Sequence, residues 1–359
     1  MRRLRICLIA NCRFPIREPF VGGLESMTAH LARELVRRGH DVTLFAAPGS
    51  DPRLGVTEMP VELLATKQLE SRWDTHAPPA VHMAEHHAYL ALMLDLADAH
   101  SHFDVVHNNS LHHLPVAMAR SLHIPVLTTL HTPPLWWLES AIRLRRGAGS
   151  FVAVSDFTTR AWSPVVPCTT ILNGVDLVRW PIGPGGPNAV WSGRIVPEKA
   201  PHEAIDAVRL AGMRLILAGP ILDDAYFQQY IAPRLHGGDV TYAGHLSQRE
   251  LAELVGSSAV AVATPAWDEP YGLVAAEAMS CGTPVAAYAR GALPELVTEF
   301  AGRLATPGDV PMLAAAMKLA TGLERSAVRD HAVTHLSLKR MVDDYERIYA
   351  GLTHPKVAA

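Results

Sequence analysis

Two glutamates eight positions apart lie in a segment whose residue types suit the binding of a phosphate or a sugar. The first, Glu269, lies in a loop after an apolar run, and the second, Glu277, lies in an apolar stretch that ends at a glycine. The pattern predicts a helix that begins near residue 271, with Glu277 about two turns inside it. The amides of Tyr271, Gly272 and Leu273 would be unpaired donors there, and such amides bind phosphate and sugar oxygens.

The carboxylate of Glu277 suits a ribose, because it can accept hydrogen bonds from two neighbouring hydroxyls. The same segment also fits a buried helix start whose carboxylates cap the helix or pair with cations. The spacing of the residues favours neither interpretation over the other.

A second segment places two cations, Arg194 and Lys199, after one predicted strand and before a predicted helix. Cations at the carboxyl edge of a parallel sheet suit a diphosphate, and they can neutralise a leaving diphosphate without a metal. The alternative is that Lys199 is solvated and that Arg194 pairs with Glu198.

The chain has 19 histidines, several of which lie where the first half of the chain could use them. His131 follows the apolar run 126–130 and is a candidate for the site, and His107 is a second candidate for the cleft. His82 and His86 flank Glu85 at helical spacing, so a zinc site is conceivable. The H-E-x-x-H pattern is absent and no third ligand is indicated, so we predict no metal site.

Trp136 and Trp137 follow two prolines in a predicted loop of the first half. Their rings could stack on an acceptor sugar or ring. The interpretation that we prefer slightly is a hydrophobic clasp that closes the loop.

The predicted elements that must position these residues form two α/β series. The first has strands near 6–10, 42–46, 105–107, 125–130 and 151–154, with a helix over 25–38. Prolines interrupt the pattern between residues 51 and 90, which predicts long loops and irregular helix. After a linker rich in proline and glycine at 164–186, the second series has strands near 190–192, 214–218, 240–242, 260–263 and, last, 284–288.

Length and composition bound the protein further. The 359 residues exceed the roughly 250–300 that one core holds, so we predict domains at 1–175 and 176–335 and a C-terminal helix, within 336–359, that packs back on the first domain. A net charge of −3 argues against a nucleic-acid partner. The sequence has no long apolar stretch, so membrane contact is at most peripheral. Four cysteines without a C-x-x-C pair fit reduced thiols in the cytoplasm.

Together these segments resemble the pattern of glycosyltransferase family 4, which has the GT-B superfold. The family's E-x7-E motif matches Glu269 and Glu277, and its G-R-x-x-x-x-K motif matches Gly193, Arg194 and Lys199. Further segments similar to the family's lie, in the expected order, at 22–25 (GGLE), 172–176 (LNGVD), 244–247 (GHLS) and 290–295 (RGALPE).

The resemblance implies two facing Rossmann-like domains with parallel sheets, and a retaining, metal-independent transfer from a nucleotide diphosphate sugar. In this family pattern Arg194 and Lys199 hold the diphosphate, Glu277 holds the ribose, and Glu269 and His131 approach the donor sugar. The other donor-binding residues that the resemblance implies are Gly22, Gly23, Leu246, Tyr271, Gly272, Leu273 and Val274.

Two positions depart from the family pattern. Tyr271 replaces the commoner phenylalanine, which does not affect a role played by the backbone. Ala292 replaces the second glycine of the G-G-x-P-E segment, so a need for backbone freedom in that loop is less well supported.

The resemblance favours a UDP-sugar donor, with a GDP-sugar as the alternative, and no further cofactor. The acceptor could be a small molecule, a glycan or a lipid-linked sugar, with a soluble acceptor preferred. The alternative functions are a nucleotide-sugar epimerase, a sugar phosphorylase and a nucleotide-sugar-binding protein without turnover. An NAD-dependent oxidoreductase is disfavoured, because no G-x-G-x-x-G follows the first strand.

Overall fold

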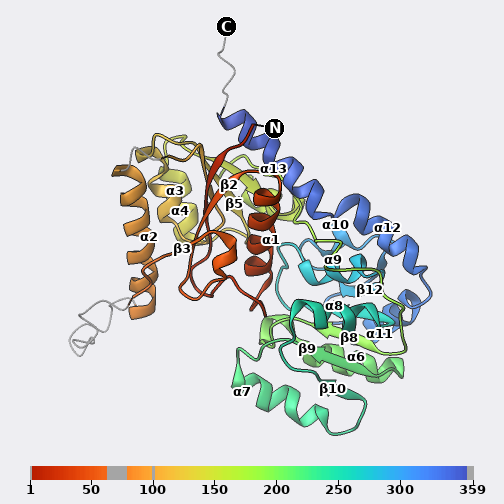
Figure 1. Ribbon diagram of the computed structural model, residues 1–359. Helices are drawn as coiled ribbons and strands as arrows, with labels where there is room; N and C mark the ends of the chain where they lie inside the picture. Colours follow the sequence, from red (N-terminus) through yellow and green to blue (C-terminus); the bar gives the residue numbers. More distant parts are fainter. Residues whose placement is uncertain (1, 63–78, 99–101, 354–359) are drawn as a thin grey trace, which may run out of the picture.

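The computed structural model describes residues 2–62, 79–98 and 102–353, and it contains two α/β domains that face each other (Figure 1). Each domain is built on one parallel sheet. The first sheet has the order β3-β2-β1-β4-β5-β6-β7 and the second β10-β9-β8-β11-β12-β13. The predicted fold class, two facing Rossmann-like domains, is confirmed.

The strands of the first sheet are β1 (Arg5–Ile9), β2 (Asp41–Ala46), β3 (Val56–Glu58), β4 (Val105–Asn108), β5 (Val126–Leu130), β6 (Ser150–Ala153) and β7 (Thr169–Thr170). Those of the second are β8 (Ala189–Ser192), β9 (Leu215–Ala218), β10 (Val240–Tyr242), β11 (Val260–Ala263), β12 (Val285–Tyr288) and β13 (Gly302–Ala305).

Helices cover both sheets. In the first domain they are α1 (Gly23–Arg37), α2 (Ala80–Asp98), α3 (Leu114–Ala117), α4 (Trp136–Leu144) and α5 (Asp156–Trp162). The second part of the chain has α6 (Pro201–Ala211), α7 (Asp224–Tyr226), α8 (Gln248–Gly256), α9 (Leu273–Ser280), α10 (Leu293–Leu296), α11 (Val310–Ala320), α12 (Arg325–His335) and α13 (Leu338–Thr353). Short 3-10 or π turns are η1 (Pro52–Leu54), η3 (Ala119–Ser121), η4 (Pro197–Lys199), η5 (Phe227–Ile231) and η6 (Ala232–Leu235).

The helix α1 shows how the sequence sets an element. Met27, Leu31 and Leu35 recur at helical spacing and are buried against the first sheet. The helix ends at Arg37, and Gly39 follows with a positive φ of 92°, a conformation that glycine adopts without strain.

The helix α2 corrects the last part of the prediction of loops and irregular helix between residues 51 and 90, because the chain is regular helix from Ala80 onward. Residues 63–78 of that predicted stretch lie outside the described residues. The buried residues of α2, Ala84, Ala88, Leu92 and Leu96, do repeat at helical spacing. Apolar residues also lie on the exposed side of the helix, so the contrast between its two faces is weak in the sequence.

Three strands were not predicted. The strand β3 pairs with β2 at one edge of the first sheet, within the stretch that was predicted to form loops. The strand β13 pairs with β12, so the run 284–288 is not the last strand of the second sheet. The strand β7 lies inside the predicted linker and forms the edge of the first sheet. All three are short and none is fully buried, which leaves little hydrophobic pattern to recognise.

In both sheets, the order in which the chain adds strands reverses at an equivalent place. In the first sheet β1 lies between β2 and β4, and in the second β8 lies between β9 and β11. Chain connections leave such a pair of strands on opposite faces of the sheet, which opens a crevice at their carboxyl ends. The fold therefore has two crevices, which lie opposite each other across the boundary between the domains.

The chain crosses between the domains twice, and the two crossings touch. The first crossing passes through Val175. The second leads from α12 into α13, which packs on the first domain (Figure 1) and buries Met341, Tyr345 and Tyr349 in the core of that domain. At the contact, the amide of Val175 donates to the Leu336 carbonyl (2.8 Å) and the amide of Leu338 donates to the Val175 carbonyl (2.9 Å). The exact domain limits stay a prediction. Within the described ranges, no helix is both long and apolar enough to cross a membrane.

Candidate active site

A pocket of about 350 Å³ lies between the domains, where the carboxyl ends of the two sheets face each other. Its first-domain wall comes from the loops after β1, β4 and β5, and its second-domain wall from the loops after β8, β9, β10 and β11. Of the residues predicted to bind the donor or act in catalysis, the pocket brings together Gly22, Gly23, His131, Arg194, Lys199, Leu246, Glu269, Tyr271, Gly272, Leu273, Val274 and Glu277.

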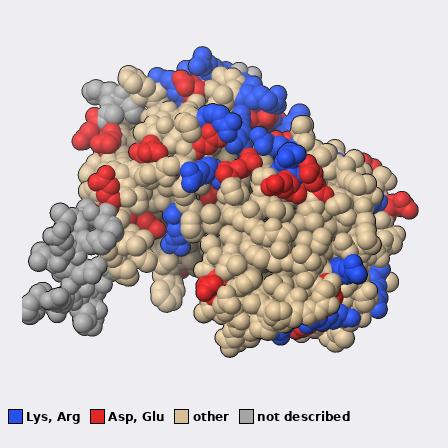
Figure 2. Space-filling model, turned by 60° about the horizontal axis from the view of Figure 1, so that its bottom comes forward, with Lys and Arg blue, Asp and Glu red and all other residues tan. Residues whose placement is uncertain are grey.

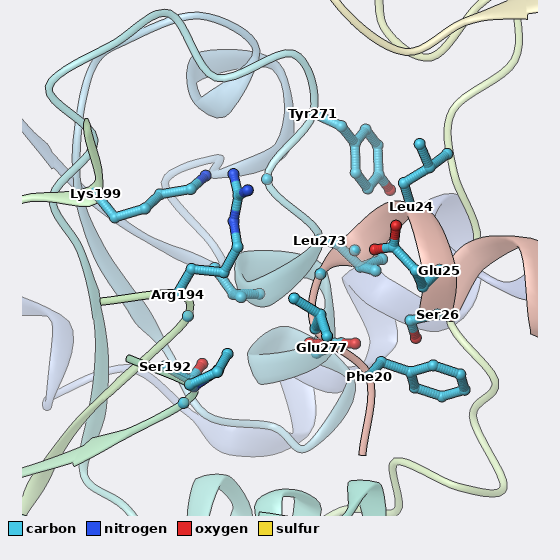
Figure 3. A pocket seen from close by; sticks show the side chains of 18 of the residues that line it. Phe20, Leu24, Glu25, Ser26, Ser192, Arg194, Lys199, Tyr271, Leu273 and Glu277 are labelled. Carbon is cyan, nitrogen blue, oxygen red and sulfur yellow. The ribbon is translucent and has the colours of Figure 1, made fainter. Parts of the chain in front are cut away.

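Two cations extend into the pocket from the segment after β8 (Figure 3). Lys199 forms a close ion pair with Glu269 and lies 5.2 Å from the centre of the Trp267 ring. Arg194 lies 3.8 Å from Glu198, a long ion pair between half-exposed groups. Lys199 is therefore held by a carboxylate of the E-x7-E segment, and the pairing of Arg194 with Glu198 is too loose to occupy its guanidinium.

The start of α9 forms another part of the second-domain wall of the pocket. Gly272 caps the helix with a φ of 99°, and a Cβ there would lie 2.7 Å from the side chain of Leu293. Only glycine fits this position, and the first amides of α9 are left free of partners within the helix. Tyr271 is buried and its hydroxyl donates to the Asn173 carbonyl, so the tyrosine anchors the loop at the domain boundary.

First-domain hydroxyls support this loop from behind. The carbonyl of Pro270 accepts hydrogen bonds from Ser155 (2.6 Å) and from Thr158 (3.1 Å). The loop that carries Glu269 is thus fixed by both domains. These contacts have no motif in the sequence, since the two hydroxyls lie more than a hundred residues before the loop.

The 290–295 segment holds Glu269 by its backbone. The amide of Ala292 donates to the Glu269 carbonyl (2.8 Å). Gly291 has a φ of 62°, and a Cβ there would lie 2.2 Å from that same carbonyl oxygen. Ala292 itself has a φ of −84°, which any residue adopts. The loop needs a glycine at 291 alone, which explains why alanine is accepted at 292.

Glu277 is a buried carboxyl group on the wall of the pocket. Its side chain is 8% exposed, and burial raises its pKa to about 8. Among the described residues no side chain or amide donates a hydrogen bond to this carboxyl group. A ligand hydroxyl that donated to it would replace the hydration that burial removes.

The N-terminus of α1 reaches the second domain at the pocket. A Cβ on Gly23 would lie 3.4 Å from the side chain of Leu273, so the glycine permits the close approach of α1 to α9. Two positions later, the carboxyl group of Glu25 is buried and its pKa is raised by that burial. Glu25 lines the pocket, and sequence reasoning missed its role (Figure 3). A buried acid two positions after a glycine pair was the available signal.

His131 lines the first-domain wall. Its Nε2 is 3.0 Å from Oδ1 of Asn109, which fixes the ring. Burial lowers the pKa of His131 to about 3, so the imidazole is neutral at pH 7. A neutral ring can orient a sugar by hydrogen bonding, but it carries no permanent positive charge to the site.

The three acceptor candidates do not line the pocket. His107 is fully buried, with Nδ1 2.6 Å from the Tyr349 hydroxyl and Nε2 2.8 Å from that of Thr129, so it joins α13 to the first sheet and is not an acceptor contact. Trp136 is 87% exposed and Trp137 50% exposed, so they are not a buried clasp either. Trp137 donates to the carbonyl of Leu111, a pocket residue, and therefore lies near the rim.

The histidine cluster that the structure forms differs from the pair considered in the sequence. His86 lies with His112 and His113, and their ring nitrogens lie within 4.8 Å of one another. His82 is exposed and is not part of this group. The two additional histidines come from the loop after β4, which the spacing along the chain does not reveal.

Charge on the outer surface is mixed. On the face shown in Figure 2, basic and acidic side chains are interleaved. This face carries no continuous basic surface of the kind that follows a nucleic-acid backbone.

Comparisons with known proteins agree with the geometry of the pocket. Residues 21–179 match the family model described as Glycosyltransferase Family 4, and residues 179–329 match the one described as Glycosyl transferases group 1. A glycogen synthase of Mycobacterium tuberculosis strain H37Rv is 29% identical over 346 residues, which covers 83% of this chain and 82% of that protein. A D-inositol 3-phosphate glycosyltransferase of Mycobacterium marinum is 40% identical over 143 residues, 37% of this chain and 29% of that one.

Solved structures share the fold at low identity. AviGT4, a glycosyltransferase involved in avilamycin A biosynthesis, has a TM-score of 0.69 at 22% identity, with 98% of each chain covered. Anabaena HepE in complex with UDP-glucose has a TM-score of 0.76 at 18% identity, covering 98% of this chain and all of that one. Since the two family models adjoin and together cover most of the sequence, and the two domains together form the GT-B fold, the chain belongs to glycosyltransferase family 4.

Proposed function

We propose that this glycosyltransferase moves a sugar from a UDP-sugar to a hydroxyl acceptor, with retention of configuration and without a metal ion. A GDP-sugar is the alternative donor. The observation that carries the proposal is the single pocket in which Arg194 and Lys199 face the free amides of α9, with Glu277 on the same wall.

The pocket offers a place for each part of the donor. The diphosphate would lie between the two cations and the start of α9, where helix amides and the helix dipole favour an anion. The ribose hydroxyls would donate to Glu277. Lys199 would then share its charge between Glu269 and the diphosphate, and the two cations would supply the neutralisation that a metal supplies in other enzymes.

The state of Glu269 supports a positioning role over that of a nucleophile. Its carboxylate is paired with Lys199 and accepts a hydrogen bond from the Trp267 ring nitrogen (3.2 Å).

In the proposed transfer, the bond between the sugar C1 and the diphosphate oxygen breaks, and the acceptor oxygen bonds to C1 on the same face. The acceptor proton passes to the departing phosphate oxygen, so the products are a glycoside and a nucleoside diphosphate.

The preference for uridine rests on the neighbours, since solved structures of Anabaena HepE hold UDP or UDP-glucose. The acceptor is proposed as a small molecule, a glycan or a lipid-linked sugar, with any membrane contact peripheral. The four cysteines are free thiols, which fits the reducing cytoplasm in which we expect the enzyme to act.

A thermal-shift series tests the donor. We expect UDP-sugars to raise the melting temperature more than GDP-sugars at equal concentration, because a ligand that binds only the native state stabilises it. Donor turnover is then followed by release of the nucleoside diphosphate, and NMR of the product anomer tests retention. An inverted product would refute retention, and turnover that requires inorganic phosphate would favour a phosphorylase.

Removal of metals tests the other half of the proposal. We expect turnover of the donor to survive treatment with a chelator, because Arg194 and Lys199 supply the positive charge at the diphosphate. The measurement is the rate of nucleoside diphosphate release before and after chelation, with added Mg²⁺ as the control. A rate that is lost on chelation and restored by the ion would contradict metal independence.

A further inference from the structure

Three histidines of the first domain converge beside the pocket without lining it. His86 lies on α2, and His112 and His113 lie in the loop between β4 and α3. Each ring offers a nitrogen, and these nitrogens lie within 4.8 Å of one another. All three residues are half-buried, so the cluster is shielded but still reachable from solvent.

The surroundings fix the rings in place. The ring of Tyr89 stacks on His112 with centroids 4.5 Å apart, and the Tyr89 hydroxyl is held by the Ala10 carbonyl and the Cys12 amide, each at 3.0 Å. The ring of His113 also stacks on His112, with centroids 4.4 Å apart. His86 approaches both, at 5.8 and 5.9 Å between ring centroids. These contacts keep the three rings close together.

The chemistry of the cluster favours a cation over an anion. Burial and the neighbouring rings lower the pKa of His112 to about 3 and lower that of His113 as well. Neutral imidazoles have lone pairs to give and no charge with which to hold an anion. Such rings are ligands for zinc and related divalent ions.

We propose that His86, His112 and His113 bind one divalent transition-metal ion, with Zn²⁺ the best match to three imidazoles and an open fourth position. One hydrogen bond must change on binding. The Nδ1 of His112 accepts from the Leu114 amide at 3.2 Å, so coordination through either nitrogen of this ring displaces that bond. The rings would also turn, because stacked planes do not aim their lone pairs at one point.

The ion would act on the shape of the pocket and not on the transfer step. His112 follows Leu111, which lines the pocket, and Glu85, next to His86, pairs with Arg13 (3.4 Å), which also lines it. An ion that ties α2 to the loop after β4 would hold this part of the first-domain wall. The donor cations Arg194 and Lys199 lie on the other domain, so the proposal is separate from metal-free transfer.

Cobalt binding tests the site directly. The full-length protein, without a histidine tag, is stripped with a chelator, desalted and titrated with Co²⁺, whose visible absorption reports tetrahedral or five-coordinate binding. We expect one Co²⁺ per chain, displaced by one Zn²⁺. His113→Ala and His86→Ala should each weaken binding by about 100-fold or more, since even outer-shell changes cost 10–100-fold.

His87→Ala is the matched control, because His87 is exposed and adjoins His86 on the same helix. It should keep the stoichiometry and affinity of the parent. Circular dichroism and the melting temperature without metal establish that each variant is folded. If His86→Ala is not folded, His86→Gln is used in its place. The proposal is overturned if the parent protein binds no stoichiometric Co²⁺, or if His86 and His113 variants bind it unchanged. Neither outcome bears on sugar transfer, which is measured separately.

Discussion

At the scale of single residues, Glu277 links stability to pH. Its pKa is raised by burial from 4.5 to about 8, so between these values the folded protein holds a proton that the unfolded chain releases. The free energy of unfolding in the absence of donor therefore falls as pH rises through this window, by up to about 1.4 kcal/mol per pH unit. Below about pH 4.5 this contribution is fully present.

We expect Glu277→Gln to flatten that dependence, because the amide does not titrate. Urea denaturation at pH 5, 6.5 and 8 measures it, with the exposed Glu253→Gln on α8 as the control. An identical pH slope in Glu277→Gln and the parent would show that the group does not titrate in this range. A second variant, Glu277→Ala, should bind the donor about 1–3 kcal/mol less tightly, through the loss of hydrogen bonds to ribose.

Lys199 is the residue whose loss should affect turnover most. Its removal takes a positive charge from the diphosphate and leaves the Glu269 carboxylate without its partner. We expect Lys199→Ala to lower turnover at saturating donor by at least about 100-fold, in the range seen when one transition-state donor is removed. Steady-state rates test this, with the exposed Lys318→Ala on α11 as the control. Normal turnover would exclude Lys199 from the diphosphate site.

Residues with a motif were located by the sequence, and residues brought in by folding were not. Both glutamates of the E-x7-E segment line the pocket because a loop and the helix that follows it are local in the chain. Ser155 supports Pro270 from another domain, and His112 meets His86 from another element. Long-range contacts of this kind leave no fixed spacing. His107 is a residue that was predicted to lie in the cleft but is buried instead. A histidine near a strand end can equally face the core.

At the scale of elements, the loop after β12 positions the loop after β11. Gly291→Ala should destabilise the protein by about 2 kcal/mol or more, because its Cβ would overlap the Glu269 carbonyl and its φ is positive. It should also lower turnover by displacing Glu269. Ala292→Gly at the next position should cost only about 0.5–1 kcal/mol, the entropic cost of glycine. Chemical denaturation compares them, and equal losses would contradict the steric argument.

The prediction of elements succeeded where burial is strong and failed where it is weak. The inner strands β4 and β11 are wholly or almost wholly buried and begin with apolar residues, so they were found within a residue or two of their limits. The edge strands β3 and β7 and the strand β13 are only partly buried, and α2 is apolar on its exposed side as well. In each missed case the tertiary neighbours, and not the local pattern, decide the conformation.

At the scale of the whole molecule, the contact between the two chain crossings governs how the domains can move. A Cβ on Gly174 would lie 2.5 Å from the Leu338 backbone, so the crossings are packed against each other. We expect Gly174→Val to force them apart and to lower both stability and turnover. Gly351→Ala is the control, because nothing lies within 4 Å of that Cβ and the change should be neutral or stabilising. Melting temperatures and donor turnover test both, and a normal enzyme with valine at 174 would contradict the tight contact.

The meeting of the two crossings at Val175 reduces the ways in which the enzyme can open. Two domains joined by one linker can move freely, but here the two crossings are bonded to each other through residues 172–175 and 336–341, which restricts that movement. We expect the remaining movement to be mainly a rotation about this contact, which would widen or narrow the mouth of the pocket. Entry of the donor, exclusion of water and release of the product would then follow from successive stages of that rotation. A protease that cut only one crossing would leave the two halves joined by the other.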